Sequence, residues 1–129
     1  MSAVAEVVLD AALLALLLGE PGAAVVAARL GHARLSAVNY SEALTKSLDR
    51  GKPLADAVAE IARFRLPVVP FDQEQAAVAA SLRVPTRMLG LSFTDRACLA
   101  LGLLRGWPVL TADRAWAKLD LGVTVELIR

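Results

Sequence analysis

The sequence predicts an α/β fold in which a central, mostly parallel sheet is flanked by helices. Short apolar segments rich in β-branched residues alternate with longer segments rich in alanine and leucine, which favour helices. Strands separated by helical segments are typical of βαβ units, whose strands run parallel. With 129 residues the chain suits one domain, expected over residues 1–129.

The expected strands are short and mostly apolar. Val7–Leu9 and Pro108–Thr111 have the composition of buried strands, and Val123–Ile128 alternates apolar and polar residues. Leu66–Phe71 contains two prolines, which place it at a sheet edge or reduce it to an extended segment. Arg34–Val38 is a further strand candidate.

Capping residues and glycines mark the expected helix boundaries. Gly19, Gly51 and Gly106 follow helical segments, and Asp72 and Asp113 are expected N-caps. The expected helices are Ala11–Leu18, Pro21–Gly31, Asn39–Arg50, Leu54–Arg63, Gln73–Leu82, Ser92–Arg105 and Arg114–Leu119, with a loop at Pro85–Leu91.

Composition excludes several classes of protein. The 14 basic and 13 acidic residues give a net charge of +1, which is not the footprint of a strong nonspecific nucleic-acid binder. The single cysteine, Cys98, excludes an internal disulfide and a cysteine-based zinc cluster, and we expect it to be a buried core thiol. The longest uncharged runs, such as Ala11–Gly19, are about half of the roughly 18 residues that a membrane span needs. We therefore expect a cytoplasmic protein.

Two aspartates follow expected strands. Asp10 comes directly after Leu9, and Asp113 lies two residues after Thr111. In open parallel sheets, ligands bind outside the carboxyl ends of the strands, which is where these two side chains are expected. Each also has a purely structural interpretation, Asp10 in an Asx turn and Asp113 as an N-cap.

Two further acids lie near the starts of expected helices. Glu42 and Asp95 stand three residues after Asn39 and Ser92, the spacing of a capping box, so both can serve as helix-capping acids. Taken together with the two aspartates, they offer the oxygen ligands that Mg²⁺ or Mn²⁺ prefers. Crowded carboxylates repel one another unless a cation is present, and a metal held this way polarises a phosphoryl oxygen.

Four segments form an ordered set of motifs along nearly the whole chain. They are Val8–Asp10 with the following run Ala12–Gly22, then Ser36–Glu42, Gly90–Leu101 and Pro108–Trp116. This set resembles the motifs of a PIN domain, and more specifically those of a VapC-type toxin. The last two segments carry the most specific part of the resemblance.

The resemblance implies a PIN-like fold and the toxin component of a type II toxin–antitoxin system. Such a toxin is a Mg²⁺- or Mn²⁺-dependent endoribonuclease that hydrolyses phosphodiester bonds in structured RNA such as tRNA or rRNA. It forms a homodimer and is inhibited by a VapB-like antitoxin. It does not bind or span a membrane. The catalytic and metal-binding acids of the family fall on Asp10, Glu42, Asp95 and Asp113, with Asp10 and Asp95 expected as direct ligands.

RNA must be drawn to this acidic pocket by nearby cations and donors. We expect Arg87 and Arg96 to contact the substrate and Thr111 to donate a hydroxyl beside the site. Lys46 and Arg114 are weaker candidates, because Lys46 fits an i,i+4 partner of Glu42 and Arg114 a solvated side chain.

One departure from the family pattern keeps a second function open. Family members usually carry Ser or Thr two residues after the first aspartate, whereas this chain has Ala12 after Asp10. This favours, as the alternative, a catalytically weakened PIN-like module that binds RNA or an antitoxin without cleaving. A scaffold that dimerises through apolar surface is a third possibility, and it predicts no metal binding. A phosphotransferase of the Asp-x-Asp type is disfavoured by the same alanine.

Overall fold

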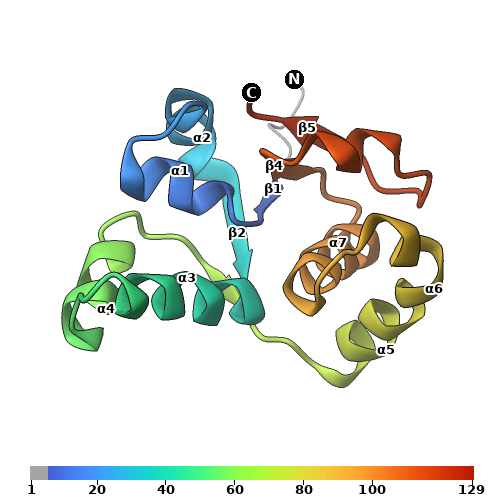
Figure 1. Ribbon diagram of the computed structural model, residues 1–129, viewed down its shortest axis with the longest axis horizontal. Helices are drawn as coiled ribbons and strands as arrows, with labels where there is room; N and C mark the ends of the chain where they lie inside the picture. The colour runs from blue at the N-terminus through green and yellow to red at the C-terminus, as the bar shows by residue number, and fades with distance from the viewer. Residues whose placement is uncertain (1–5) are drawn as a thin grey trace.

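A single parallel sheet organises the molecule, which we describe over residues 6–129 from a computed structural model (Figure 1). The strands follow the order β3-β2-β1-β4-β5, and every neighbouring pair is parallel. The strands are β1 (Val7–Leu9), β2 (Ala33–Ser36), β3 (Val68–Val69), β4 (Val109–Thr111) and β5 (Val125–Leu127). The predicted α/β fold with a parallel sheet and flanking helices is confirmed.

Helices cover both faces of the sheet (Figure 1). The α-helices are α1 (Ala12–Leu18), α2 (Ala23–Arg29), α3 (Ala37–Asp49), α4 (Leu54–Ala62), α5 (Gln73–Ser81), α6 (Arg83–Thr86) and α7 (Phe93–Arg105). Among the described residues, three 3₁₀ segments follow α2, α6 and β4, and they are η1 (Leu30–His32), η2 (Arg87–Leu89) and η3 (Arg114–Lys118). Helices α1 to α4 pack on one face, and α5 and α7 pack on the other.

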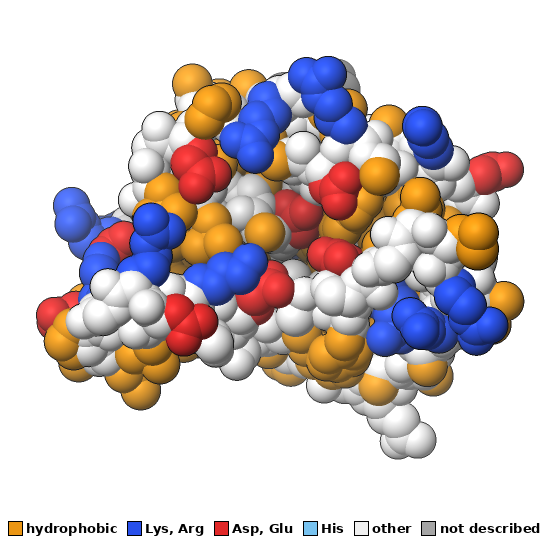
Figure 2. Space-filling view, in the orientation of Figure 1, with side chains coloured by type: hydrophobic (Ala, Val, Ile, Leu, Met, Phe, Trp, Pro, Cys, Tyr) orange, Lys and Arg blue, Asp and Glu red, His pale blue; other side chains and the backbone are white. Residues whose placement is uncertain are grey.

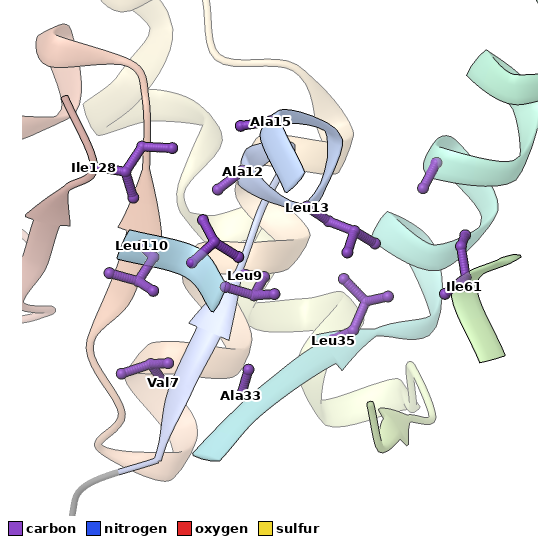
Figure 3. Close-up of a cluster of buried hydrophobic side chains, with 12 residues drawn as sticks. Val7, Leu9, Ala12, Leu13, Ala15, Ala33, Leu35, Ile61, Leu110 and Ile128 are labelled. Carbon is purple, nitrogen blue, oxygen red and sulfur yellow. The ribbon is translucent and has the colours of Figure 1, made fainter. Parts of the chain in front are cut away.

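The central strand β1 supplies side chains to the cores on both faces. Val7 and Leu9 lie in the cluster under α1 to α4, beside Leu13 and Leu35 (Figure 3). Val8 points the opposite way and packs with the cluster around α7. This alternation follows from the two-residue period of a strand. Both faces of β1 are therefore buried, which fixes the position of the residue that follows it.

Gly102 lets α7 approach β4 closely. A Cβ atom at this position would lie 2.8 Å from Val109 Cγ2 and 2.9 Å from the carbonyl oxygen of Trp107. The backbone contact cannot yield as a flexible side chain can. The absence of a side chain at Gly102 therefore sets the spacing between the helix that begins at Phe93 and the strand that ends at Thr111.

The start of α3 differs from the sequence-based expectation. Ser36 is the N-cap, and its hydroxyl accepts a hydrogen bond from Val38 N at 3.2 Å. The helix therefore begins at Ala37 and the preceding strand ends at Ser36, so the prediction of a strand to Val38 was wrong. Asn39 was predicted as the N-cap, but it is buried in the first turn of the helix.

The segment predicted as a loop at Pro85–Leu91 is partly helical. Helix α6 places Pro85 in its first turn, where the missing N–H costs no helix hydrogen bond. The hydroxyl of buried Thr86 donates to the carbonyl oxygen of Leu82 at 2.6 Å, which ties the segment back to α5. This helix was not predicted from the sequence, because Pro85 was interpreted as a residue that ends helical structure.

In the described part of the chain, no single helix has the length and hydropathy of a membrane span. The pair Ala12–Leu18 and Ala23–His32 together reaches that length and composition, with a bend of 109° between them.

Candidate functional site

Asp10 lies at the carboxyl end of β1, in the middle of the sheet. Its side chain is 6% exposed. Oδ1 accepts a hydrogen bond from Ala12 N at 2.6 Å, and Oδ2 accepts one from the hydroxyl of Thr111 at 2.6 Å. The first bond closes the Asx turn that the sequence allowed. The second arises because Leu9 pairs with Leu110, which brings the ends of β1 and β4 side by side.

The buried position of Asp10 makes its negative charge costly. Burial raises the pKa of the Asp10 carboxyl from its ordinary 3.8 to about 6. The hydrogen bonds from Thr111 and Ala12 oppose this rise in the pKa, and the nearby charges of Asp95 and Glu42 add to it. Three of the predicted acids therefore lie close enough to affect one another electrostatically.

Asp95 lies in the first turn of α7 and forms the predicted capping box. Ser92 Oγ accepts from Asp95 N at 3.2 Å, and Asp95 Oδ2 accepts from Ser92 N at 2.9 Å. The capping bonds fix the orientation of the Asp95 side chain. Its other oxygen, Oδ1, accepts no hydrogen bond from residues 6–129 and is free for a ligand.

Glu42 does not cap its helix, contrary to the capping-box interpretation. Because α3 begins at Ala37, Glu42 lies in the second turn. There its Oε2 accepts a hydrogen bond from the Thr94 hydroxyl at 2.6 Å. This contact joins α3 to the first turn of α7, immediately beside Asp95.

Asp113 is the N-cap of η3, as the sequence predicted for this segment. Its Oδ1 accepts from Ala115 N at 3.0 Å, and its own N–H donates to Thr111 Oγ1 at 3.0 Å. Thr111 thus bonds to both Asp10 and Asp113 and is itself fully buried. We expected its hydroxyl to lie beside the site, and it lies within hydrogen-bond distance of two of the four acids.

Three of the four acids share one pocket. Asp10, Asp95 and Asp113 line a pocket of about 420 Å³ at the carboxyl edge of the sheet. Glu42 lines a separate, open pocket along α3. Acidic side chains gather around the hollow at the centre of the face shown in Figure 2, with basic side chains on its rim.

The donor set suits a hard divalent cation, although it is not a closed ligand cage. Carboxylate oxygens are the ligands that Mg²⁺ and Mn²⁺ prefer. The raised pKa of Asp10 reflects burial and nearby negative charges, which a cation would compensate. Within residues 6–129, however, no three histidine, cysteine, aspartate or glutamate side chains are placed to hold one ion together. An ion in this pocket would therefore take at most two direct ligands from Asp10, Asp95 and Asp113, with water completing its shell, as is common for Mg²⁺.

The predicted arginines occupy different surroundings. Arg96 donates to the carbonyl oxygen of Ala79 at 2.9 Å, and its guanidinium lies 6.0 Å from the centre of the Phe93 ring. It thereby joins α7 to α5. Arg87 is exposed on η2 and does not line the acidic pocket.

Two other arginines line the acidic pocket, and neither was predicted from the sequence. Arg50 is the C-cap residue of α3, and Arg129 is the last residue of the chain. Arg129 donates to the carbonyl oxygen of Pro21 at 3.3 Å and lies 3.9 Å from Glu20. A basic residue at a helix C-terminus is ordinary, so nothing in the sequence marked Arg50.

Cys98 is a buried thiol behind the acids, which confirms the expectation of a core residue. Burial, together with the negative charges of Asp10, Asp95 and Glu42, raises its pKa well above the ordinary range of a thiol. A thiol in this state is a poor nucleophile.

The chain belongs to the PIN domain family, because the sequence matches the family over residues 7–121. The fold is similar to that of a chain in a toxin–antitoxin complex from Klebsiella pneumoniae, with a TM-score of 0.74 and 17% identity over 96% of this chain and 98% of that chain. DNA-bound VapBC from Salmonella typhimurium also gives a TM-score of 0.74, at 17% identity over 98% of this chain and 100% of that chain.

A VapBC complex from Mycobacterium tuberculosis is similar at 24% identity, with a TM-score of 0.66 over 98% of this chain and 99% of that chain. At these identities the likeness is one of fold. No curated protein matches the sequence.

Proposed function

We propose that this PIN domain is a VapC-type toxin, a Mg²⁺- or Mn²⁺-dependent endoribonuclease that cuts structured RNA of the tRNA or rRNA class. The observation that carries the proposal is the pocket in which Asp10, Asp95 and Asp113 meet at the carboxyl edge of a parallel sheet. Membership of the PIN family and the fold shared with VapBC complexes support it. We propose that the protein acts in the cytoplasm, where this RNA is found.

The acids divide the work of hydrolysis among them. Asp10 and Asp95 would hold the cation directly, and Glu42 and Asp113 would complete its shell through water. When bound, the ion polarises a phosphoryl oxygen and makes a water molecule more acidic. Water oxygen forms a bond to phosphorus as the P–O bond to the leaving nucleoside breaks. Glu42 or Asp113 accepts the proton of the attacking water, and the leaving alkoxide takes a proton from solvent.

Thr111 supports Asp10 in the absence of a hydroxyl at Ala12. Its hydrogen bond to Asp10 Oδ2 favours the ionised carboxylate, which is the form that binds a cation. We propose that this hydrogen bond offsets the missing Ser or Thr after Asp10. We propose that Thr111 acts by positioning Asp10 rather than by touching RNA, because its side chain is fully buried.

We propose that Arg50 binds a phosphate of the RNA. It is exposed at the end of α3 and lines the acidic pocket, so its guanidinium can pair with a phosphate near the acids. Arg129 and the sequence-predicted Arg87 are secondary candidates on the surrounding surface.

Two protein partners belong to the proposal. A small groove beside the acidic pocket is lined by Leu14, Leu17 and Leu18 of α1 together with Lys46 and other polar residues, and it suits an amphipathic segment of a VapB-like antitoxin. Co-expression with the protein encoded beside this chain should give a complex that survives size-exclusion chromatography.

Exposed apolar residues support a homodimer. Met88 is 96% exposed and Val84 70% exposed, both in the α6–η2 region. Light scattering of the purified chain should give twice the mass of the 13.6 kDa chain, and a monomer at all concentrations would contradict this part of the proposal.

The cleavage assay uses total RNA, Mn²⁺ and the purified chain without antitoxin. We expect discrete RNA fragments that are absent with a chelator and absent with D95N. The second candidate, a PIN-like module that binds without cutting, is favoured by the lack of three converging metal ligands among residues 6–129. It predicts RNA or antitoxin binding with no fragments at any Mn²⁺ concentration.

A further inference from the structure

A chain of hydroxyl groups connects Glu42 to the start of α7. Thr94 Oγ1 lies 2.6 Å from Glu42 Oε2 and 3.0 Å from Ser92 Oγ. A carboxylate only accepts hydrogen bonds, so the single hydroxyl proton of Thr94 goes to Glu42. The Ser92 hydroxyl then donates to Thr94, while it accepts from Asp95 N at 3.2 Å. The hydrogen bonds run in one direction, from Asp95 N to Glu42.

Thr94 is held on its backbone side as well. The buried Asn39 side chain donates from Nδ2 to the carbonyl oxygen of Thr94 at 3.1 Å. Asn39 and Glu42 both lie on α3, so two contacts tie this helix to one residue of α7. A side chain fixed by both its backbone and its neighbours makes a stable anchor for a flexible glutamate.

The anchor also sets where Glu42 lies relative to Asp95. Asp95 Oδ2 accepts from Ser92 N at 2.9 Å, so Ser92 and Thr94 together hold both carboxylates. One oxygen of each carboxylate is occupied by this network, and the other is left to face a ligand. A flexible glutamate side chain loses conformational entropy when it is ordered beside an ion. A hydrogen bond that already orders the side chain removes part of this entropy cost before the ion binds.

We propose that Thr94 is a positioning residue that prearranges Glu42 for the divalent cation of the acidic site. This inference rests on the proposed metal-dependent function. Thr94 itself is not expected to touch RNA or the ion.

Calorimetric titration of Mn²⁺ into the purified full chain tests this role. T94V keeps the size and branching of the side chain and removes the hydroxyl. We expect it to weaken Mn²⁺ binding about tenfold, at the lower end of the range for residues that hydrogen-bond to metal ligands. T94S restores the hydroxyl and should bind within about threefold of the wild type. T45V is the matched control, because Thr45 is an exposed threonine of α3 whose hydroxyl bonds only to Ser41 O within its own helix.

The double variant separates positioning from a general structural effect. If Thr94 acts through Glu42, E42Q weakens Mn²⁺ binding and adding T94V to E42Q weakens it no further. Melting temperatures of all variants identify any that fail to fold. T94A replaces T94V in that event and is expected to show the same loss.

Five outcomes are distinguishable. Weaker binding in T94V, rescue by T94S and no further loss in E42Q/T94V support the inference. Unchanged Mn²⁺ affinity in T94V, or an equal loss in the presence and absence of E42Q, overturns it and leaves the proposed function intact. An equal loss in T45V would mark the effect as a general one of threonine substitution and would also overturn it. A wild-type chain that binds no Mn²⁺ overturns both the inference and the proposed function.

Discussion

The hydroxyl of Thr111 donates to Asp10 Oδ2 at 2.6 Å and accepts from Asp113 N at 3.0 Å, which links the ends of β1 and β4. This one buried side chain orients one acid directly and holds the backbone of a second. It also gives Asp10 a hydroxyl partner in a chain that has alanine at position 12. The hydroxyl that supports Asp10 therefore comes from the end of β4 and not from position 12 at the start of α1.

Replacing Thr111 with valine tests this support. T111V removes the donor to Asp10 and the acceptor for Asp113 N, and it leaves a buried carboxylate oxygen without its partner. We expect Mn²⁺ affinity to fall by at least about tenfold and unfolding free energy at pH 8 to fall by about 1–3 kcal/mol. T111S should retain most of both quantities. Equal behaviour of T111V and T111S would contradict the role of the hydroxyl.

The raised pKa of Asp10 predicts how stability depends on pH. Between about pH 4 and the folded pKa of about 6, the unfolded chain ionises Asp10 while the folded chain keeps it protonated. Its contribution to the unfolding free energy is therefore largest below pH 4, falls as pH rises through this window and is then constant. The pKa difference corresponds to a loss of roughly 3 kcal/mol.

The D10N variant isolates this contribution from those of other acids. Denaturant unfolding of wild type and D10N from pH 4 to pH 8, without metal, should show D10N gaining stability relative to the wild type as pH rises. A constant difference between the two proteins across this range would contradict the burial of an ionisable Asp10.

Much of this fold was predictable because its signals are local. Apolar runs predicted the strands around Val8 and Leu110, and the spacing of Ser92 and Asp95 predicted the capping box of α7. The start of α3 was misjudged because Ser36 and Asn39 are both good N-caps, and only the end of the preceding strand decides between them.

The site was predictable only as a set of residue types. The positions of Asp10 and Asp113 follow from parallel strands whose carboxyl ends share one edge, and Asp95 is placed by the capping box at the start of α7. The Thr94–Glu42 contact and the position of Arg50 depend on how α3 packs against α7 and α1. A local sequence pattern does not predict such packing between helices. Arg96 drew attention because it follows Asp95, yet its guanidinium joins α7 to α5.

Arg50 provides a test of how RNA reaches the pocket. R50Q removes a charge that lines the acidic pocket, and we expect cleavage of RNA to slow about tenfold through weaker binding. R63Q, which removes an arginine from the end of α4 outside that pocket, is the matched control for net charge. The salt dependence of RNA binding should also decrease in R50Q. Equal losses in both variants would indicate only a general charge effect.

Gly102 offers a test of packing behind the site. G102A places a methyl group within 2.8–2.9 Å of Val109 and the Trp107 carbonyl, and we expect a destabilisation of about 1–3 kcal/mol. G31A is the control, because nothing lies within 4 Å of a Cβ there. Thermal melts of the two variants should differ clearly, and equal melting temperatures would contradict the close approach of α7 to β4.

Mn²⁺ titration of wild type, D95N and D120N by calorimetry tests the central claim most directly. The D95N substitution keeps a side-chain oxygen that can accept the capping bond from Ser92 N, so this variant should fold, and D120N removes an acid outside the pocket. We expect millimolar or tighter binding of Mn²⁺ in the wild type and in D120N, and none in D95N. Binding that persists in D95N, or is absent from the wild type, would contradict a metal-dependent nuclease and leave Asp95 and Asp113 as helix-capping residues.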